Sequence, residues 1–408
     1  MGFQVTQEYA YEIINGSAVV WRCFSRTTKA VIPSEIDGYP VTSVAPYAFS
    51  SHMDEKLMIG KKLTSLQGKV NNYKSVSQES HKVCIEVSKE SEIMSDHQED
   101  RLKDTSFNSF TLDVLCGDQL EEVVLPNSVK RVGRYCFYDC KNLNKLSFTD
   151  ALIDWGSGAF TGCHQIEKLE VNMYQSEKTT LKDLLVELPE PVEVDYRFIS
   201  DTNGYYAKLI FPEYYEEGVE NTPARLINLT IHGSGMRFRN CFEQRRFLFE
   251  EYDKHFRFAG FQEKFEVVAS LAEGRLCYPY TLKEEYKMVY EDYLIACCNA
   301  YGRFLLDRGD VKRMLWFIEL VLSRLDDTVL IHKDVINDLI DDKLKKEDIN
   351  SKYYDIKNTK QRCLHWLSQM IDYAARVQKQ EMVSLLMDYN HCLKPKENKK
   401  KRSFDFDL

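Results

Sequence analysis

Apolar positions in the first half of the chain recur with a fixed period of 23 residues. Two segments align without a gap, LEEVVLPNSVKRVGRYCFYDCKN from Leu120 and LNKLSFTDALIDWGSGAFTGCHQ from Leu143, and a third begins with IEKLEV at Ile166. A fixed period of about 20 to 30 residues is typical of a solenoid, in which each turn buries its apolar side only against its neighbours. The pattern therefore predicts stacked, similar turns.

Each of these turns begins with alternating apolar and polar residues. The alternation predicts short strands at 120–125, 143–148 and 166–171, adjacent and parallel in one sheet. The next residues, VKRVGRYCF in the first turn, space their apolar positions more like a helical turn, so an irregular or helical return is expected after each strand. Gly133 and Gly156 are expected where the chain bends tightly between the two parts.

The same pattern extends beyond these turns in both directions. Residues 31–49, VIPSEIDGYPVTSVAPYAF, follow it upstream. Before them, 11–24 reads as a hairpin that turns at Asn15-Gly16 and covers the open edge of the first repeat. Downstream, 206–211 and 226–231 are expected to be two further strands.

A polar segment at 51–117 interrupts the repeats. It is rich in Ser, Glu and Lys, a composition that buries little surface. Strands are expected within it at 63–68 and 83–87. Both a tolerated insertion and a functional loop fit such a segment.

After about Cys241 the apolar period changes to that of α-helices. A broad helical stripe is expected from Phe242, Phe247, Phe249, Tyr252 and Phe256.

Signals for helix ends follow this stripe. Thr281 with Glu284 resembles a capping box for a helix that ends at Arg308-Gly309, and Asp310 is expected to cap the next helix. Further helices are predicted at 333–347, 359–378 and 380–390.

The hairpin, the phrase IPSEIDGYPVTSVAPYAF and the AF-x-x-C ending resemble the BspA-like class of bacterial leucine-rich repeats. The resemblance covers roughly residues 1–232. It implies a protein-interaction solenoid without catalytic residues, and many members of the class are displayed on the cell surface. The phrase MIDYAARVQKQEMVSLLMDY is similar to an ankyrin-type helix pair, although the ankyrin TPLH signature is missing.

Together these patterns predict an α+β multidomain protein. A leucine-rich-repeat solenoid with an N-terminal hairpin cap and a parallel β-sheet face is expected at 1–235. An all-α domain of ankyrin-like helix pairs is expected at 236–393, and a basic, flexible tail at 394–408.

Composition and charge limit the classes of partner and the cellular locations that are expected for the chain. The net charge of −9 argues against nucleic acid as a partner, because phosphate binding needs a positive surface. No apolar run is long enough to span a membrane, and the first residues lack the features of a secretory signal. Without such a signal, twelve cysteines indicate reduced thiols and a cytoplasmic location. An exported surface adhesin is the alternative.

Candidate sites for chemistry are few. Cys136, Cys140, Cys163 and His164 could be imagined as a metal site, but Cys140 and Cys163 share one repeat position, which favours buried packing thiols. Gly156-Ser157-Gly158 and Gly233-Ser234-Gly235 lack the third glycine of a nucleotide site and are expected to be turns.

No catalytic, metal or cofactor residues are therefore predicted, and the expected function is a non-catalytic scaffold or adaptor that binds other proteins. An enzyme hidden in the helical half is an alternative. Arg237, Arg239, Arg245 and Arg246 are expected to form a solvated, ion-paired face.

The last fifteen residues offer the one candidate binding motif. Lys394 to Arg402 is strongly basic, and Phe404, Phe406 and Leu408 then alternate with two aspartates. In an extended strand these three apolar residues share one face. This is the arrangement of a short peptide that adds to a sheet edge or a groove on a partner protein or a neighbouring copy.

Overall fold

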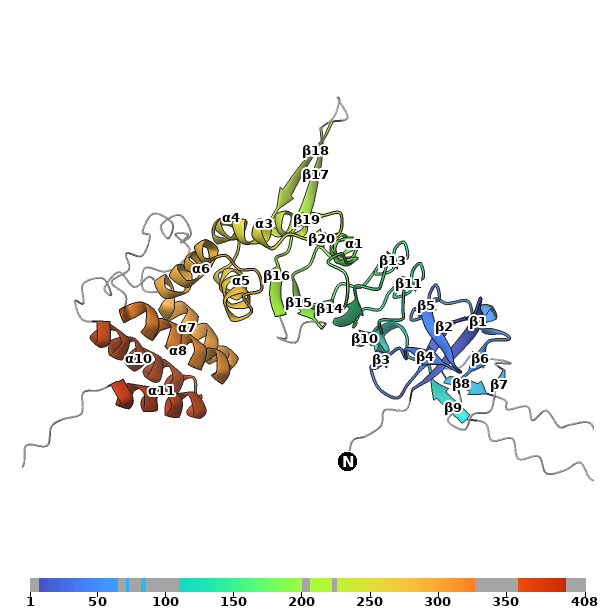
Figure 1. Ribbon diagram of the computed structural model, residues 1–408, viewed down its shortest axis with the longest axis horizontal. Helices are drawn as coiled ribbons and strands as arrows, with labels where there is room; N and C mark the ends of the chain where they lie inside the picture. The colour runs from blue at the N-terminus through green and yellow to red at the C-terminus, as the bar shows by residue number, and fades with distance from the viewer. Residues whose placement is uncertain are drawn as a thin grey trace, which may run out of the picture. The chain divides into compact units, whose positions relative to one another are not determined.

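A computed structural model of the chain describes residues 7–64, 71–72, 82–85, 110–199, 206–221, 226–326 and 359–393 (Figure 1). It divides into two compact units. The first holds residues 1–255 and 277–282, and the second holds 256–276 and the residues from 283 onward.

The first unit is a β-solenoid built on a sheet that we call the principal sheet. Its strands, in spatial order, are β16 (Tyr206–Phe211), β15 (Val192–Phe198), β14 (Lys168–Met173), β12 (Lys145–Thr149), β10 (Glu122–Val124) and β3 (Lys29–Val31). All neighbours are parallel except β15 and β16. Val123 pairs with Leu146 and Leu146 with Leu169, which confirms the register expected from the 23-residue period.

A second sheet, the return sheet, runs beside the first. Its strands, in order, are β13 (Asp154–Trp155), β11 (Arg131–Val132), β5 (Tyr39–Val44), β2 (Ser17–Phe24), β1 (Glu8–Ile14), β6 (Lys62–Leu63) and β7 (Asn71–Asn72), with β4 (Glu35–Ile36) beside β5. The hairpin of β1 and β2 turns at Asn15-Gly16, both with positive φ, and pairs with β5 at the edge of the repeats. This confirms the predicted cap.

Of the irregular or helical return expected in VKRVGRYCF, the structure has the irregular form and no helix. The segment begins with β11, in which Val132 pairs with Val44 of the preceding repeat and with Trp155 of the following one. Hydrogen-bonded turns follow the strand. A segment this short forms too few internal hydrogen bonds to nucleate a helix, whereas its backbone finds partners in both adjacent repeats.

Gly133 and Gly156 allow the backbones of successive turns to lie close together, and neither is needed for an unusual backbone angle. A Cβ on Gly133 would lie 2.3 Å from the backbone nitrogen of Pro46, and one on Gly156 would lie 2.2 Å from that of Arg134. Neither glycine has a positive φ. The expected tight bend is therefore corrected to tight stacking of successive turns.

The interruption leaves the solenoid continuous. Lys29 of β3 pairs directly with Glu122 of β10, although the polar segment lies between them in sequence. The described part of that segment includes a short 3-10 helix η1 (Glu55–Met58), β8 (Lys82–Ile85) and β9 (Phe110–Asp113). The strands expected at 63–68 and 83–87 overlap β6 and β8, and the rest of each lies outside the described residues.

Short elements close the far end of the principal sheet. They are α1 (Leu181–Glu187), α2 (Gly235–Arg239), β19 (Phe242–Glu243), β20 (Arg246–Phe247) and α3 (Phe249–Lys254). The Tyr252 hydroxyl donates to the carbonyl of Ile210 in β16 and accepts from its backbone N–H, both at 2.8 Å. The helical stripe expected here is wrong for Phe242 and Phe247, which face each other in the β19–β20 hairpin.

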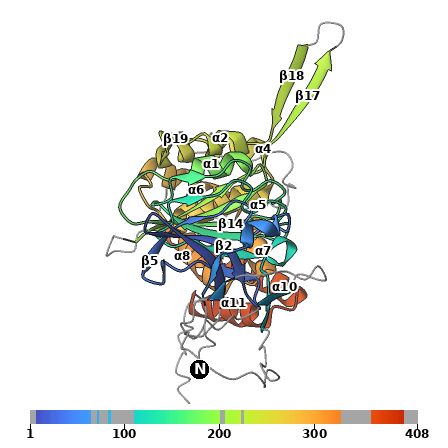
Figure 2. The same ribbon diagram turned by 90° about the vertical axis from the view of Figure 1, so that its right-hand side faces the viewer.

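The strand expected at 226–231 forms as β18 (Leu226–His232), but it does not join the principal sheet. It pairs antiparallel with β17 (Tyr215–Asn221) in a two-stranded ribbon. The ribbon projects away from the solenoid in both views (Figures 1 and 2).

The second unit is α-helical. Its described helices are α4 (Phe256–Gln262), α5 (Phe265–Cys277), α6 (Glu284–Ala296), α7 (Cys298–Arg308), α8 (Val311–Asp326), α10 (Thr359–Arg376) and α11 (Gln380–Leu393). None of the described helices is long and apolar enough to cross a membrane. The helix expected at 333–347 lies outside the described residues.

Helix ends in this unit follow the sequence signals only in part. Gly309, with φ of 68°, ends α7, and the Asp310 carboxylate accepts from the backbone N–H of Arg313 at 3.0 Å, as expected. The capping box is wrong, because Thr281 has a positive φ and α6 begins at Glu284 without a side-chain cap. The predicted long helix is also broken, at Cys297 between α6 and α7.

A buried carboxylate ties three of these helices together. Glu273 of α5 accepts from the Tyr301 hydroxyl at 2.7 Å, from Arg308 at 3.1 Å and from Arg313 at 3.2 Å. Because buried charges are retained only when paired, this cluster holds α5, α7 and α8 in register.

Candidate interaction surface

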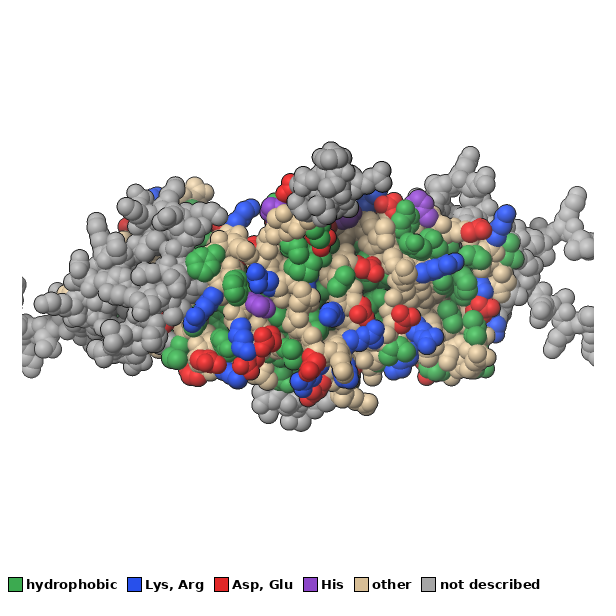
Figure 3. Space-filling view, turned by 90° about the horizontal axis from the view of Figure 1, so that it is seen from above, with side chains coloured by type: hydrophobic (Ala, Val, Ile, Leu, Met, Phe, Trp, Pro, Cys, Tyr) green, Lys and Arg blue, Asp and Glu red, His purple; other side chains and the backbone are tan. Residues whose placement is uncertain are grey.

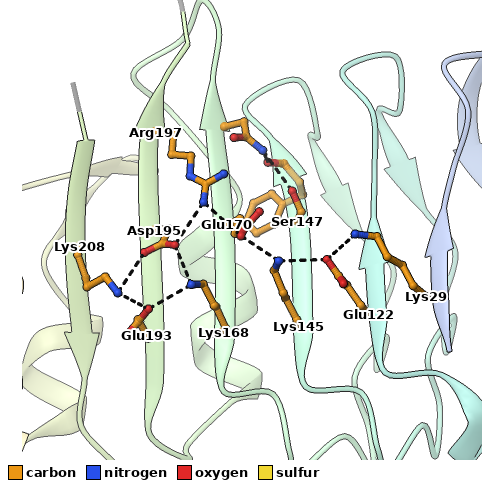
Figure 4. Close-up of polar contacts among 12 residues, drawn as sticks. Lys29, Glu122, Lys145, Ser147, Lys168, Glu170, Glu193, Asp195, Arg197 and Lys208 are labelled. Atoms are coloured by element: carbon orange, nitrogen blue, oxygen red, sulfur yellow. Dashed lines mark hydrogen bonds and ion pairs between the residues drawn. The ribbon is translucent and has the colours of Figure 1, made fainter. Parts of the chain in front are cut away.

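The outward face of the principal sheet carries a continuous row of paired charges. Strand alternation sends residues such as Leu146 and Leu169 into the core and their polar neighbours outward. We call the outward set the charge ladder: Lys29, Glu122, Lys145, Lys168, Glu170, Glu193, Asp195, Arg197 and Lys208 (Figure 4).

The ladder begins at β3 and continues strand by strand. The Glu122 carboxylate lies 2.9 Å from the Lys29 ammonium and 3.1 Å from that of Lys145. Lys145 also contacts Glu170 at 3.0 Å, and Glu170 in turn contacts Arg197 at 3.2 Å. Each of these pairs joins different strands, so the ladder links the repeats along their outer face.

The far part of the ladder centres on Asp195, whose side chain is only 2% exposed. Lys168 lies 3.1 Å from it, Arg197 3.5 Å and Lys208 3.8 Å. The Glu193 carboxylate pairs with two of these cations, at 3.4 Å from Lys168 and 2.6 Å from Lys208. Three cations therefore surround two carboxylates at this end of the sheet (Figure 4).

The pKa values of the ladder residues show that the pairing outweighs desolvation. Burial opposes the charged form of Asp195, but hydrogen bonds from Tyr206 and Lys168 hold the pKa below its usual value. The pKa of Glu122 is likewise lowered against desolvation by its two lysine neighbours. The pKa of Lys145 is raised despite desolvation, because carboxylates flank it on both sides.

This arrangement suits docking rather than bond-making. Each ladder carboxylate is neutralised by at least two cations, so none is free to act as a base. The more exposed groups are cationic ends such as Lys29 and Arg197, which keep donors available for a partner. A rigid face of alternating charge gives specificity to an association through charge complementarity.

The cysteines considered for a metal site lie in the solenoid core. Cys136, Cys140 and Cys163 are buried, as predicted. The Cys140 thiol donates to the carbonyl of Phe49 at 3.3 Å, and the Cys163 thiol donates to that of Phe137 at 3.0 Å. Burial raises the pKa of Cys163 to about 12 and raises those of the other two as well.

In the part of the chain that the structure describes, these thiols form no metal-binding group with other side chains. His164 turns to the surface, where its Nδ1 lies 2.9 Å from Glu190. Among the described residues, no group of three or more His, Cys, Asp or Glu side chains is arranged to hold a metal ion. The shared repeat position of Cys140 and Cys163 therefore serves packing between turns.

The arginines expected to form an ion-paired face differ in their environment, because some are exposed ion pairs and one is buried. Arg245 pairs with Asp183 at 2.7 Å and Arg246 with Glu243 at 3.4 Å, in agreement with the expected ion-paired face. Arg239 does not fit that expectation, because its guanidinium is buried. It donates to the carbonyls of Leu185, Leu188, Glu190, Pro212 and Gly235.

This burial lowers the pKa of Arg239 to about 10. Its role is structural, because one side chain joins the end of α1 to the start of α2 and to the segment after β16.

The binding residues predicted in the tail, Phe404, Phe406 and Leu408, lie outside the described residues. The charge ladder was not predicted from the sequence. A signal was present, because Lys145 and Lys168 occupy one repeat position and each is followed two residues later by a polar residue. The ladder residues on β3, β15 and β16 lie outside the regular period, which hid the continuity.

Comparison with known proteins supports the repeat assignment. The family model described as a BspA type leucine rich repeat region (6 copies) matches residues 108–182, which contain β10, β12 and β14. This confirms the resemblance over those residues. No curated protein and no solved structure matches the chain. The ankyrin-like resemblance of the helical half stays a prediction.

Proposed function

We propose that the chain is a non-catalytic scaffold or adaptor that binds a partner protein on the outward face of the principal sheet. The observation that carries the proposal is the charge ladder, which crosses all six strands of a solenoid whose repeats match a leucine-rich-repeat family. Repeats of this kind form extended binding surfaces. A protein partner fits better than nucleic acid, because carboxylates alternate with the cations along the ladder.

The same mixture of charges extends to another face of the molecule. Figure 3 shows acidic and basic side chains interspersed over it. Partners with both signs of charge fit such surfaces better than a polyanion or an anionic membrane does.

We place this scaffold in the cytoplasm. No disulfide joins the cysteines of the described residues, and most of these cysteines are buried. Buried thiols outside disulfides are typical of a reducing compartment. The alternative, an exported adhesin, predicts recovery in a cell-wall fraction, and fractionation of cells that produce the chain decides between them.

Affinity purification with paired variants tests the binding face. Lys29→Gln with Arg197→Gln removes the two most exposed cations of the ladder. The control, Lys130→Gln with Lys141→Gln, removes the same charge from exposed lysines elsewhere in the solenoid. We expect a protein that co-purifies with the unaltered chain to be lost from the first variant and retained by the control.

Thermal unfolding of both variants completes this test. If the two variants unfold at the same temperature and the ladder variant still retains the partner, the principal sheet is excluded as the binding face.

A further inference from the structure

The ribbon of β17 and β18 exposes an apolar row. Leu229 is 58% exposed and Ile231 is 48% exposed, two positions apart on β18. They pair with Gly218 and Glu216 of β17, so these four residues share one face of the ribbon. Two neighbouring aliphatic side chains exposed on a projecting strand form an apolar surface that a partner can cover.

On the opposite face of the ribbon, the polar groups of Tyr215, Glu217 and His232 lie beside one another. Tyr215 and His232 stack with ring centroids 4.5 Å apart, and His232 lies 2.9 Å from the Glu217 carboxylate. The need for a partner therefore falls on the face that bears Leu229 and Ile231.

Each strand of the ribbon also has a free edge. Among the described residues, β17 and β18 pair only with one another. A two-stranded ribbon is marginally stable in water on its own, and a free strand edge is a template for another strand. Addition of a third strand would provide both missing backbone partners and cover for the apolar row.

The base of the ribbon is fixed to the solenoid. A Cβ on Gly233 would lie 2.6 Å from the carbonyl oxygen of Glu213, and one on Gly235 would lie 2.1 Å from that of Pro212. The backbone N–H of Tyr214 donates to the carbonyl of Pro189. The ribbon is thus presented from a rigid support, which lowers the entropy cost of binding.

We propose that the free edge of β18 binds residues 394–408 of a second copy of this chain. In an extended segment, Phe404, Phe406 and Leu408 lie on one face with the two-residue spacing of Leu229 and Ile231. A strand added beside β18 places these two apolar rows next to each other.

Charge favours the same occupant. On β17, Glu216 and Glu217 are exposed, as is Glu213 just before it. The segment from Lys394 to Arg402 is strongly basic and directly precedes the apolar row. One segment of the chain therefore carries both chemistries that complement the ribbon, apolar residues in strand spacing and positive charge.

Peptide binding and sedimentation velocity test the proposal on the full chain. A fluorescent peptide of residues 394–408 is titrated with the Phe404→Ala/Phe406→Ala chain, whose own segment competes poorly. We expect saturable binding that weakens with added salt, and about tenfold weaker binding to a chain that also carries Leu229→Ser/Ile231→Ser. The matched control Ile153→Ser/Val186→Ser alters residues that are 50% and 60% exposed and should bind as before.

In sedimentation, the unaltered chain should self-associate with rising concentration, and excess peptide should dissociate it. Equal binding by the Leu229→Ser/Ile231→Ser and control chains would exclude the ribbon as the docking site. Peptide binding by a chain that stays monomeric at every concentration would exclude a second copy as the occupant. Circular dichroism of each variant shows that a loss of binding is not a loss of fold.

Discussion

Single buried side chains hold the solenoid turns together. Phe49, Phe137 and Phe160 occupy one position in successive repeats, and their rings stack 5.4 and 5.3 Å apart. Each is buried, so the three rings form a column through the core. Phe137 has a ring on both sides, and its removal therefore affects two interfaces between turns.

Phe137→Ala is expected to lower the free energy of unfolding by about 3–5 kcal/mol, the usual cost of a truncated core aromatic. Urea unfolding measures it. The control Val186→Ala alters an exposed residue of α1 and should change the free energy by less than about 0.5 kcal/mol. A Phe137 variant as stable as the control would contradict the stacked column.

Arg239 offers a second test at this scale. Arg239→Lys keeps the charge but replaces a planar fork of five donors by one ammonium, which leaves buried carbonyls such as those of Leu188 and Pro212 without donors. We expect a loss of about 3 kcal/mol in the free energy of unfolding. Arg246→Lys, at an exposed ion pair, should cost little, and equal effects in urea unfolding would refute a special role for Arg239.

At the scale of elements, the 23-residue period was enough to predict β10, β12 and β14 of the principal sheet and their register. It could not predict β15, because the longer connection that contains α1 breaks the period before Val192. In the return sheet, β11 and β13 are only two residues long, and no alternation can be recognised over so short a stretch.

The β19–β20 hairpin was missed for a different reason. Its turn residues, Gln244 and Arg245, both have positive φ, which is uncommon for these residue types. Sequence rules look for Asn-Gly or Asp-Gly at such a turn, so the flanking phenylalanines were assigned to a helix.

The candidate site was harder to predict than the fold. Charged residues at outward strand positions are visible in the sequence, but the ladder depends on which strands are neighbours. β3 lies beside β10 only because the intervening segment leaves the stack, and β16 reverses direction beside β15. Neither pairing follows from local sequence.

Close stacking of turns can be tested with one methyl group. Gly156→Ala would bring a Cβ against the backbone of Gly133 and Arg134, which cannot move aside without separating two turns. We expect a loss of about 3 kcal/mol in unfolding free energy. Gly38→Ala is the control, because Gly38 has a positive φ but nothing within 4 Å of its Cβ position, so only backbone strain of about 1–2 kcal/mol applies.

The contribution of the ladder to stability should depend on pH. Because the pKa of Asp195 is lower in the folded chain, its pairing stabilises the fold above the unfolded pKa of about 3.9 and is lost as pH falls through the folded value. Asp195→Asn should cost about 1–3 kcal/mol at pH 7, and the difference from the unaltered chain should shrink below about pH 4.

Urea unfolding at pH 7 and at pH 3 measures the difference in unfolding free energy between the Asp195→Asn variant and the unaltered chain. The control Glu167→Gln alters an exposed carboxylate beside the ladder. A deficit of the Asp195 variant that is equal at pH 7 and pH 3 would show that the side chain acts through packing rather than charge.

At the scale of the whole molecule, the first unit is a stack with different closures at its two ends. The β1–β2 hairpin pairs with β5 and covers the first turn, and Tyr252 with Arg239 seals the far end of the principal sheet. Repeats need such caps because each turn buries its apolar side only against a neighbour. The polar segment enters between the first two turns without displacing them.

Deletion of most of this polar segment should therefore leave the solenoid intact. Thr64 donates its backbone N–H to Tyr9 of β1, and Val114 bridges to Phe24 of β2. Glu8 and Phe24 pair directly across the hairpin, so the two ends of the segment lie about three strand spacings apart, roughly 15 Å. A Gly/Ser linker of about ten residues spans roughly 33 Å and can replace residues 65–109.

Because loop closure costs only about 0.6 kcal/mol for each doubling of length, the shortened chain should unfold cooperatively within about 1 kcal/mol of the intact one. Urea unfolding followed by tryptophan fluorescence measures both properties. Trp155, on β13, reports on one end of the return sheet, and Trp21, on β2, reports on the hairpin. Separate transitions, or a loss above about 3 kcal/mol, would mean that the replaced residues form part of the core and that the repeats do not stack without them.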